Sequence, residues 1–138
     1  MVFLRFLAIV LLTTTGLLKL EALLQHPESI PSGPDPVFPI VRHDHLLLLA
    51  AAAELGLAGI FALGVWRSLA FAALTTMSVA FAAYGWVLAK AGYQASCGCV
   101  GVVFSDSPNQ SLVRHTILAS MLFCGWAGFL RTLKPSPR

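Results

Sequence analysis

The sequence predicts an all-α integral membrane protein in which residues 1–138 form a single membrane domain, a bundle of four transmembrane helices. Of its 138 residues, 57% are hydrophobic and 11% are charged, whereas about a quarter of the residues in soluble proteins are charged. The apolar residues form long runs, and a bilayer core of about 30 Å needs roughly 20 apolar residues per helix. Four runs fit, and they leave too little chain for a soluble domain: residues 2–24, 46–65, 69–91 and 112–130.

The first run, residues 2–24, has one alternative interpretation, a secretory signal peptide. Arg5 gives it a weak basic start before the apolar stretch. The run is long for the apolar part of a signal peptide, however, and its end, "LLKLEALLQ", lacks the pair of small residues that a peptidase requires. A membrane-spanning helix is therefore favoured.

The second and third runs are separated by a predicted tight turn at Trp66, Arg67 and Ser68. Both runs carry small residues, which let helix backbones approach closely inside a membrane. We expect close packing at these positions: Ala52, Gly56 and Gly59 in the second run, and Ala73, Ser78, Ala82 and Gly85 in the third. In the fourth run, Cys124 lies near the middle, so it is expected to be a buried and inert thiol.

The distribution of cations predicts that both termini are cytoplasmic. In that orientation five cations face inward, namely Arg5, Arg67, Arg131, Lys134 and Arg138, and three face outward, namely Arg42, Lys90 and Arg114. Residues 25–45 and 92–111 become the outer loops. The protein is then expected in the bacterial inner membrane, with the lipid bilayer as its surroundings. The net charge of +3 comes from such anchoring residues, so no nucleic-acid partner is expected.

The second outer loop contains the motif Cys97-Gly98-Cys99. Such a pair can cycle between dithiol and disulfide, bind a soft metal such as Cu(I), Zn or Hg, or remain idle. A disulfide across one residue closes a small strained ring, and strain makes a disulfide easier to reduce. The outer compartment of a bacterium is kept oxidising. A redox pair of Cys97 and Cys99 is therefore favoured, with no resident metal.

Two charges inside the predicted helices form a second candidate site. Lys19 lies about five residues before the outer end of the first helix, and Glu54 lies about eight residues into the second. At about 1.5 Å per residue, their depths differ by about 4 to 5 Å. Charges within membranes are costly and tend to pair in the bundle interior. We predict an intramembrane ion pair between Lys19 and Glu54, which serves either as a structural clamp or as a proton or substrate site.

The stretch "RHDHL" places His43 and His45 on either side of Asp44. An irregular loop could present both imidazoles to a metal. A helix start would separate them, and Asp is a favourable N-cap. We expect Asp44 to cap the second helix, with both histidines in solvent.

These features together resemble the methylamine-utilisation MauE family and its DoxX-like relatives. The resemblance rests on "GLLKL" in the first helix, a proline-bearing outer loop, "AELGLAGIFAL" in the second helix and "SCGCVG" after the third. In that family the cysteine motif usually reads C-G-C-F-G, so Val100 departs from it conservatively. The resemblance implies disulfide handling or maturation of periplasmic proteins, with Cys97 and Cys99 as the exchanging thiols and a thioredoxin-like partner. Lys19 and Glu54 match the intramembrane Lys and acid of the family.

Three functions remain open on these residues. The first is a membrane redox accessory protein that exchanges disulfides with a periplasmic thioredoxin-like or substrate thiol protein. The second is a soft-metal carrier or transporter that uses Cys97 and Cys99, together with His43 and His45. The third is a structural subunit of a larger membrane complex. A quinone would suit the membrane side of the first function, but no motif marks a site for one, so no cofactor is expected.

Overall fold

The computed structural model of the protein describes residues 2–25, 30, 33–90 and 110–133. Within them it contains four helices and no strand: α1 (Val2–Gln25), α2 (His43–Leu63), α3 (Arg67–Lys90) and α4 (Gln110–Leu133). All four helices contain a stretch long and apolar enough to cross a membrane. The predicted four-helix membrane fold is therefore confirmed. Cys97 and Cys99 lie outside the described residues.

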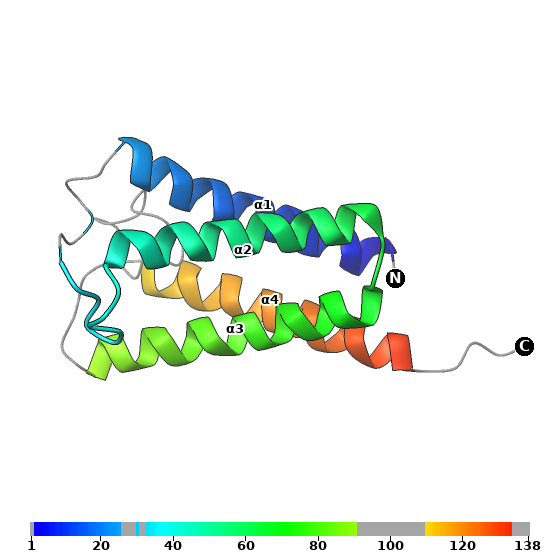
Figure 1. Ribbon diagram of the computed structural model, residues 1–138. Coiled ribbons are helices and arrows are strands. Elements are labelled where there is room, and N and C mark those ends of the chain that lie inside the picture. The colour runs from blue at the N-terminus through cyan, green and yellow to red at the C-terminus, as the bar shows by residue number, and fades with distance from the viewer. Residues whose placement is uncertain (1, 26–29, 31–32, 91–109, 134–138) are drawn as a thin grey trace, which may run out of the picture.

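The four helices run up and down alongside one another, as Figure 1 shows. α1 packs extensively against α2, and α3 packs extensively against α4, whereas α2 and α3 contact each other sparingly. The bundle thus consists of two helical hairpins. We call the end that holds the α2–α3 connection the turn end, and the opposite end, where α2 begins and α3 finishes, the loop end.

The start of α2 differs from the prediction. The helix begins at His43 rather than Leu46, and the N-cap position is occupied by Arg42, which makes no capping hydrogen bond through its side chain. Asp44 lies in the first turn, where its carboxylate accepts hydrogen bonds from the Arg42 guanidinium at 3.1 and 2.9 Å and from the His45 amide. The predicted cap at Asp44 is therefore wrong, because its oxygens are bound to Arg42 and to its own neighbour.

The α2–α3 turn consists of Gly64, Val65 and Trp66, because α3 already begins at Arg67. The predicted turn at Trp66, Arg67 and Ser68 therefore overlaps it only at Trp66. Gly64 has a left-handed backbone with a φ of 71°, and its amide donates to the carbonyls of Ile60 and Phe61, which is a common way for a helix to end. The Arg5 guanidinium of α1 donates to the carbonyls of Phe61 and Ala62, at 2.5 and 2.6 Å. A cation from the first helix thereby satisfies the carbonyls at the end of the second.

Close helix packing occurs at different glycines from those predicted. A methyl group added at Gly16 of α1 would lie 2.9 Å from Leu55, and one at Gly125 of α4 would lie 2.9 Å from the Thr75 backbone nitrogen. A methyl group at Gly128 would overlap the Phe71 ring. The expectation of close packing at three other glycines is wrong, because no heavy atom that the structure describes lies within 4 Å of an added methyl group there: Gly56, Gly59 and Gly85.

The core of the bundle lies nearer the turn end. Its buried residues come from all four helices and include Leu12, Phe61, Phe71 and Met121. Cys124 belongs to this core with 0% exposure, and its thiol donates to the Leu4 carbonyl at 3.0 Å. The prediction of a buried thiol at Cys124 is confirmed.

Candidate functional site

The structure brings Lys19 of α1 and Glu54 of α2 together in the interior of the first hairpin. The Lys19 ammonium lies 2.8 Å from each carboxylate oxygen of Glu54, and it also donates to the Thr15 carbonyl at 3.4 Å. Both side chains are 1% exposed. Two charges of opposite sign in direct contact form a neutral unit, which reduces the cost of placing either one in an apolar interior.

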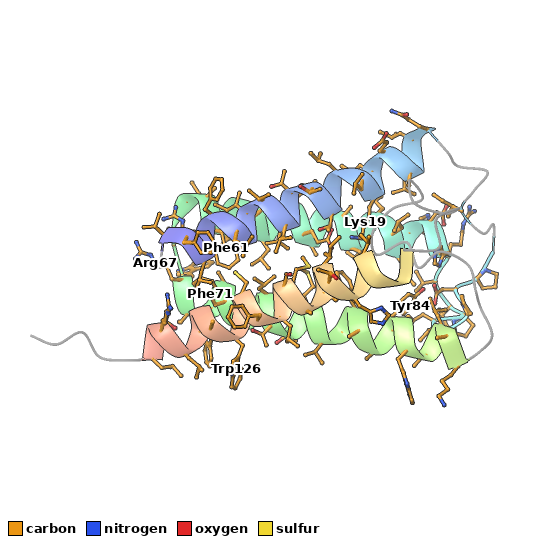
Figure 2. The ribbon with its side chains drawn as sticks, turned by 180° about the vertical axis from the view of Figure 1, so that it is seen from behind. Lys19, Phe61, Arg67, Phe71, Tyr84 and Trp126 are labelled. Carbon is orange, nitrogen blue, oxygen red and sulfur yellow. The ribbon has the colours of Figure 1, made fainter. Side chains whose placement is uncertain are left out.

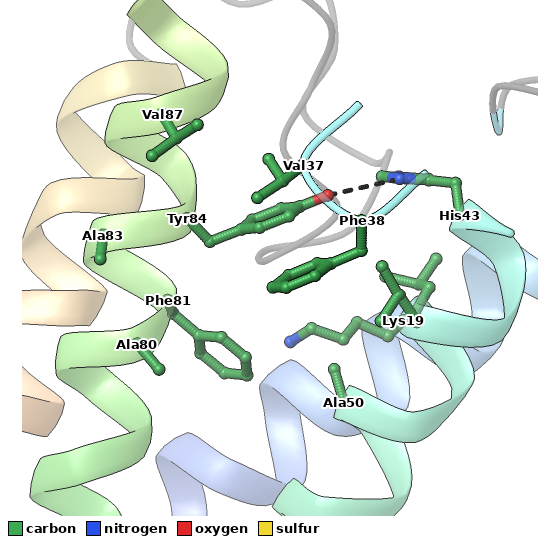
Figure 3. A pocket seen from close by; sticks show the side chains of 12 residues that line it. Lys19, Val37, Phe38, His43, Ala50, Ala80, Phe81, Ala83, Tyr84 and Val87 are labelled. Atoms are coloured by element: carbon green, nitrogen blue, oxygen red, sulfur yellow. Dashed lines mark hydrogen bonds between the residues drawn. The ribbon is translucent and has the colours of Figure 1, made fainter. Parts of the chain in front are cut away.

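The pair also faces the second hairpin. The Lys19 ammonium lies 5.5 Å from the centre of the Phe81 ring of α3, within the range of a cation–π interaction. Figure 3 shows the ammonium directed toward this ring. Lys19 therefore lies between the two hairpins, although its ion-pair partner belongs to the first.

A second polar cluster lies at the loop end and was not predicted. Asp35 is buried, and one of its carboxylate oxygens accepts hydrogen bonds from the amides of Val37 and Phe38 at 2.8 and 3.0 Å. Its other oxygen accepts a hydrogen bond from the Tyr84 hydroxyl and lies 2.7 Å from Nδ1 of His43. One carboxylate thus ties the segment before α2 to both α2 and α3.

These contacts affect the acidity of Asp35. Burial by itself would raise the pKa of its carboxyl group. The hydrogen bonds from Tyr84, from His43 and from the two amides outweigh burial, so the pKa of Asp35 lies below its ordinary value. The cluster is therefore built around an ionised carboxylate.

The two histidines do not act together. The His43 side chain is only 12% exposed and lies against Asp35 and Tyr84, so the expectation that it is solvated is wrong. His45 is exposed, as predicted. The part of the chain that the structure describes holds no group of three or more His, Cys, Asp and Glu residues that could bind a metal.

A local signal could have pointed to Asp35. An Asp that begins a turn often accepts hydrogen bonds from amides two or three residues later, and the sequence Asp35-Pro36-Val37-Phe38 has this form. No sequence signal links Asp35 to Tyr84, because they are 49 positions apart.

A cavity of about 370 Å³ lies between α2 and α3 toward the loop end. Its lining is almost entirely apolar, with Lys19 on one side and His43 and Tyr84 nearer the loop end. Figure 3 shows Lys19, Phe81, Phe38 and Tyr84 around this space. Figure 2, from the opposite side, shows Lys19 and Tyr84 in the half of the bundle away from Phe61 and Phe71. The loop end therefore combines a buried ion pair, a polar cluster and an apolar cavity.

The predicted cysteine pair is attached to this same end. α3 ends at Lys90 and α4 begins at Gln110, both at the loop end. The chain between them carries Cys97 and Cys99, which lie outside the described residues. The connection therefore starts and finishes at the end of the bundle that holds the cavity.

Comparison with known proteins bears on the whole of this arrangement. A family model described as methylamine utilisation protein MauE matches residues 1–130. That range includes three complete helices, most of α4 and every residue discussed above as part of a site. No curated protein and no solved structure matches the chain.

Proposed function

The chain belongs to the MauE family of membrane proteins, and from this premise we propose that it supports disulfide formation or thiol–disulfide exchange in periplasmic partner proteins. The protein is a multi-pass membrane protein with four candidate spans. The observation that carries the proposal is the Cys97-Gly98-Cys99 motif within the family match. Two thiols separated by one residue can exchange with a partner more readily than they can serve as a permanent cross-link.

The chemistry requires a deprotonated thiol. The thiolate of one cysteine attacks the disulfide of a partner protein and forms a mixed disulfide, and the second cysteine then displaces the partner. In this direction the partner gains a dithiol while Cys97 and Cys99 become a disulfide. In the reverse direction the partner is oxidised and the Cys97–Cys99 disulfide is reduced to the dithiol.

The compartment follows from the proposed orientation. If both termini are cytoplasmic, the loop end faces the periplasm of a bacterial inner membrane, where a disulfide can persist. The natural partner is then a thioredoxin-like protein or a substrate thiol protein. Cys124 does not compete in this reaction, because it is buried and hydrogen-bonded to the Leu4 carbonyl.

The described residues hold in place the end of the bundle from which the cysteine segment extends. Asp35, His43 and Tyr84 fix the segment before α2 against α3, whose last residue, Lys90, leads into the cysteine segment. Lys19 and Glu54 lie deeper in the same half of the bundle. We assign them a role in supporting this reaction from within the membrane, beyond clamping two helices together.

The test is an alkylation-shift measurement of the Cys97/Cys99 redox state in intact cells. We expect a disulfide that reductant opens, and we expect Cys97→Ser or Cys99→Ser to trap a mixed disulfide with a periplasmic protein. Cys124→Ser is the matched control and should leave both results unchanged. A Cys97/Cys99 pair that stays free and unreactive in every condition would refute the proposed function.

A further inference from the structure

The cavity between α2 and α3 opens on the side of the bundle. Three of its lining residues, Ala80, Ala83 and Val87 of α3, are exposed on the protein surface. Because α2 and α3 are both candidate membrane spans, this side faces lipid. A ligand of the cavity would therefore enter from the membrane, and it would have to be soluble there.

The charge next to the cavity selects the polar group of such a ligand. Lys19 lines the cavity, whereas Glu54 does not. The ion pair therefore presents its positive end to the cavity. A positive end attracts a group with partial negative charge, such as a carbonyl oxygen, and it repels a cation.

The walls of the cavity select the shape of the ligand. Three aromatic rings line it, those of Phe38, Phe81 and Tyr84. The Phe38 and Tyr84 rings are nearly parallel, with planes 3° apart and centroids 6.4 Å apart. Aromatic rings pack favourably against other flat rings in offset arrangements. A planar head group suits these walls better than a flexible acyl chain does.

We propose that this cavity binds the head group of a lipid-soluble quinone. A quinone is planar, carries carbonyl acceptors and dissolves in the bilayer, and the cavity volume of about 370 Å³ lies within the range of about 300 to 1,000 Å³ that is usual for small-molecule sites. Its role as an oxidant rests on the proposed function. Oxidation of one dithiol forms an S–S bond and releases two electrons and two protons, and the quinone takes up all four as it becomes a quinol.

Binding can be measured without thiol chemistry. The full-length protein carrying Cys97→Ser and Cys99→Ser is placed in lipid nanodiscs and titrated with decylubiquinone and, separately, with a short-chain menaquinone. We expect saturable binding of at least one of them. Ala83→Phe, which fills the cavity from an exposed position, should weaken that binding by about tenfold or more.

The matched control is Ala82→Phe on the same helix. Ala82 is also exposed but does not line the cavity, so this variant should bind as the parent protein does. Palmitate added in equal amount should not displace the quinone. The proposal is overturned if neither quinone binds saturably, if both variants bind equally, or if palmitate competes on equal terms. Because the parent protein lacks Cys97 and Cys99, none of these outcomes reflects a failure of disulfide exchange.

Discussion

At the scale of single residues, the Lys19–Glu54 contact pairs two opposite charges inside the helical bundle. Each side chain is 1% exposed and the two are 2.8 Å apart. Removing one partner of a buried pair leaves an uncompensated charge, which typically costs about 3 to 5 kcal/mol. Replacing both partners by apolar residues of similar size is often neutral or stabilising. Removing one partner therefore tests the effect of the pair on stability, and replacing both partners tests its effect on function in a protein that still folds.

We predict that Glu54→Leu lowers the free energy of unfolding by about 3 kcal/mol or more. The double variant Lys19→Met with Glu54→Leu should recover most of the loss, because it leaves no charge unpaired. Unfolding of the purified protein in detergent micelles measures both values. Glu21→Gln is the control, because Glu21 is a half-buried acid on α1, the helix that carries Lys19, and its effect should stay within about 0.5 kcal/mol.

The same double variant tests the role of the pair. If Lys19 and Glu54 support the exchange reaction, the double variant should fold and accumulate normally but fail to cycle Cys97 and Cys99 in the alkylation-shift measurement. Normal cycling would show that the pair is a structural clamp.

Asp35 leads to a prediction about pH. Its pKa is lowered in the folded protein, so its hydrogen bonds contribute stability above the ordinary pKa of an aspartate, near pH 4. That contribution is lost as the pH falls through the lowered pKa. Hydrogen-exchange protection of the Val37 and Phe38 amides, which donate to Asp35, should therefore persist at the ordinary aspartate pKa, near pH 4, and be lost only at lower pH. Asp35→Asn should show no such step, and a wild-type protein without the step would contradict the prediction.

Single residues also show what the sequence could and could not predict. The Lys19–Glu54 contact can be predicted from the sequence, because two charges in apolar runs at similar depth have few other partners. The hydrogen bond between Asp35 and Tyr84 cannot be predicted in this way, because it depends on how the segment before α2 folds over α3. For the same reason the sequence predicts His43 in solvent, since its partner Asp35 lies in a proline-rich segment without periodicity.

At the scale of helices, the glycines show which surfaces meet. The sequence predicts that small residues permit close packing, and this is true of Gly16, Gly125 and Gly128. Composition does not say which small residue faces a neighbour, because apolar residues surround each helix and no amphipathic pattern marks its buried face. The number and type of the helices could therefore be predicted, but not their contact faces.

The contrast between glycines that face a neighbouring helix and glycines that do not allows a direct test of the α3–α4 contact. Gly125→Ala would place a methyl group 2.9 Å from the Thr75 backbone nitrogen and 3.2 Å from the Phe71 carbonyl oxygen. We expect it to lower the free energy of unfolding by about 1 to 3 kcal/mol through overpacking. Gly56→Ala on α2 meets open space among the described residues. It should be neutral or stabilising by up to about 1 kcal/mol, and equal losses in the two variants would contradict the assigned faces.

At the scale of the whole molecule, orientation determines whether the proposed chemistry has the right compartment. We predict that the loop end is periplasmic and the turn end cytoplasmic. In a protein with Cys97, Cys99 and Cys124 replaced by Ser, a cysteine at Ile40, which is 98% exposed, should react with a membrane-impermeant maleimide in intact spheroplasts. A cysteine at Trp66, which is 72% exposed at the turn end, should react only after the membrane is opened. The reverse pattern would place the cysteine motif in a reducing compartment.

The division into two hairpins has a consequence for how the protein enters the membrane. Lys19 and Glu54 both belong to the first hairpin, and Arg5 closes that hairpin at its other end by binding the last carbonyls of α2. Each buried charge alone would cost about 2.5 to 3.5 kcal/mol to insert. Since Lys19 and Glu54 neutralise each other within α1 and α2, the first hairpin can enter the bilayer with this pair already formed, before α3 has been synthesised.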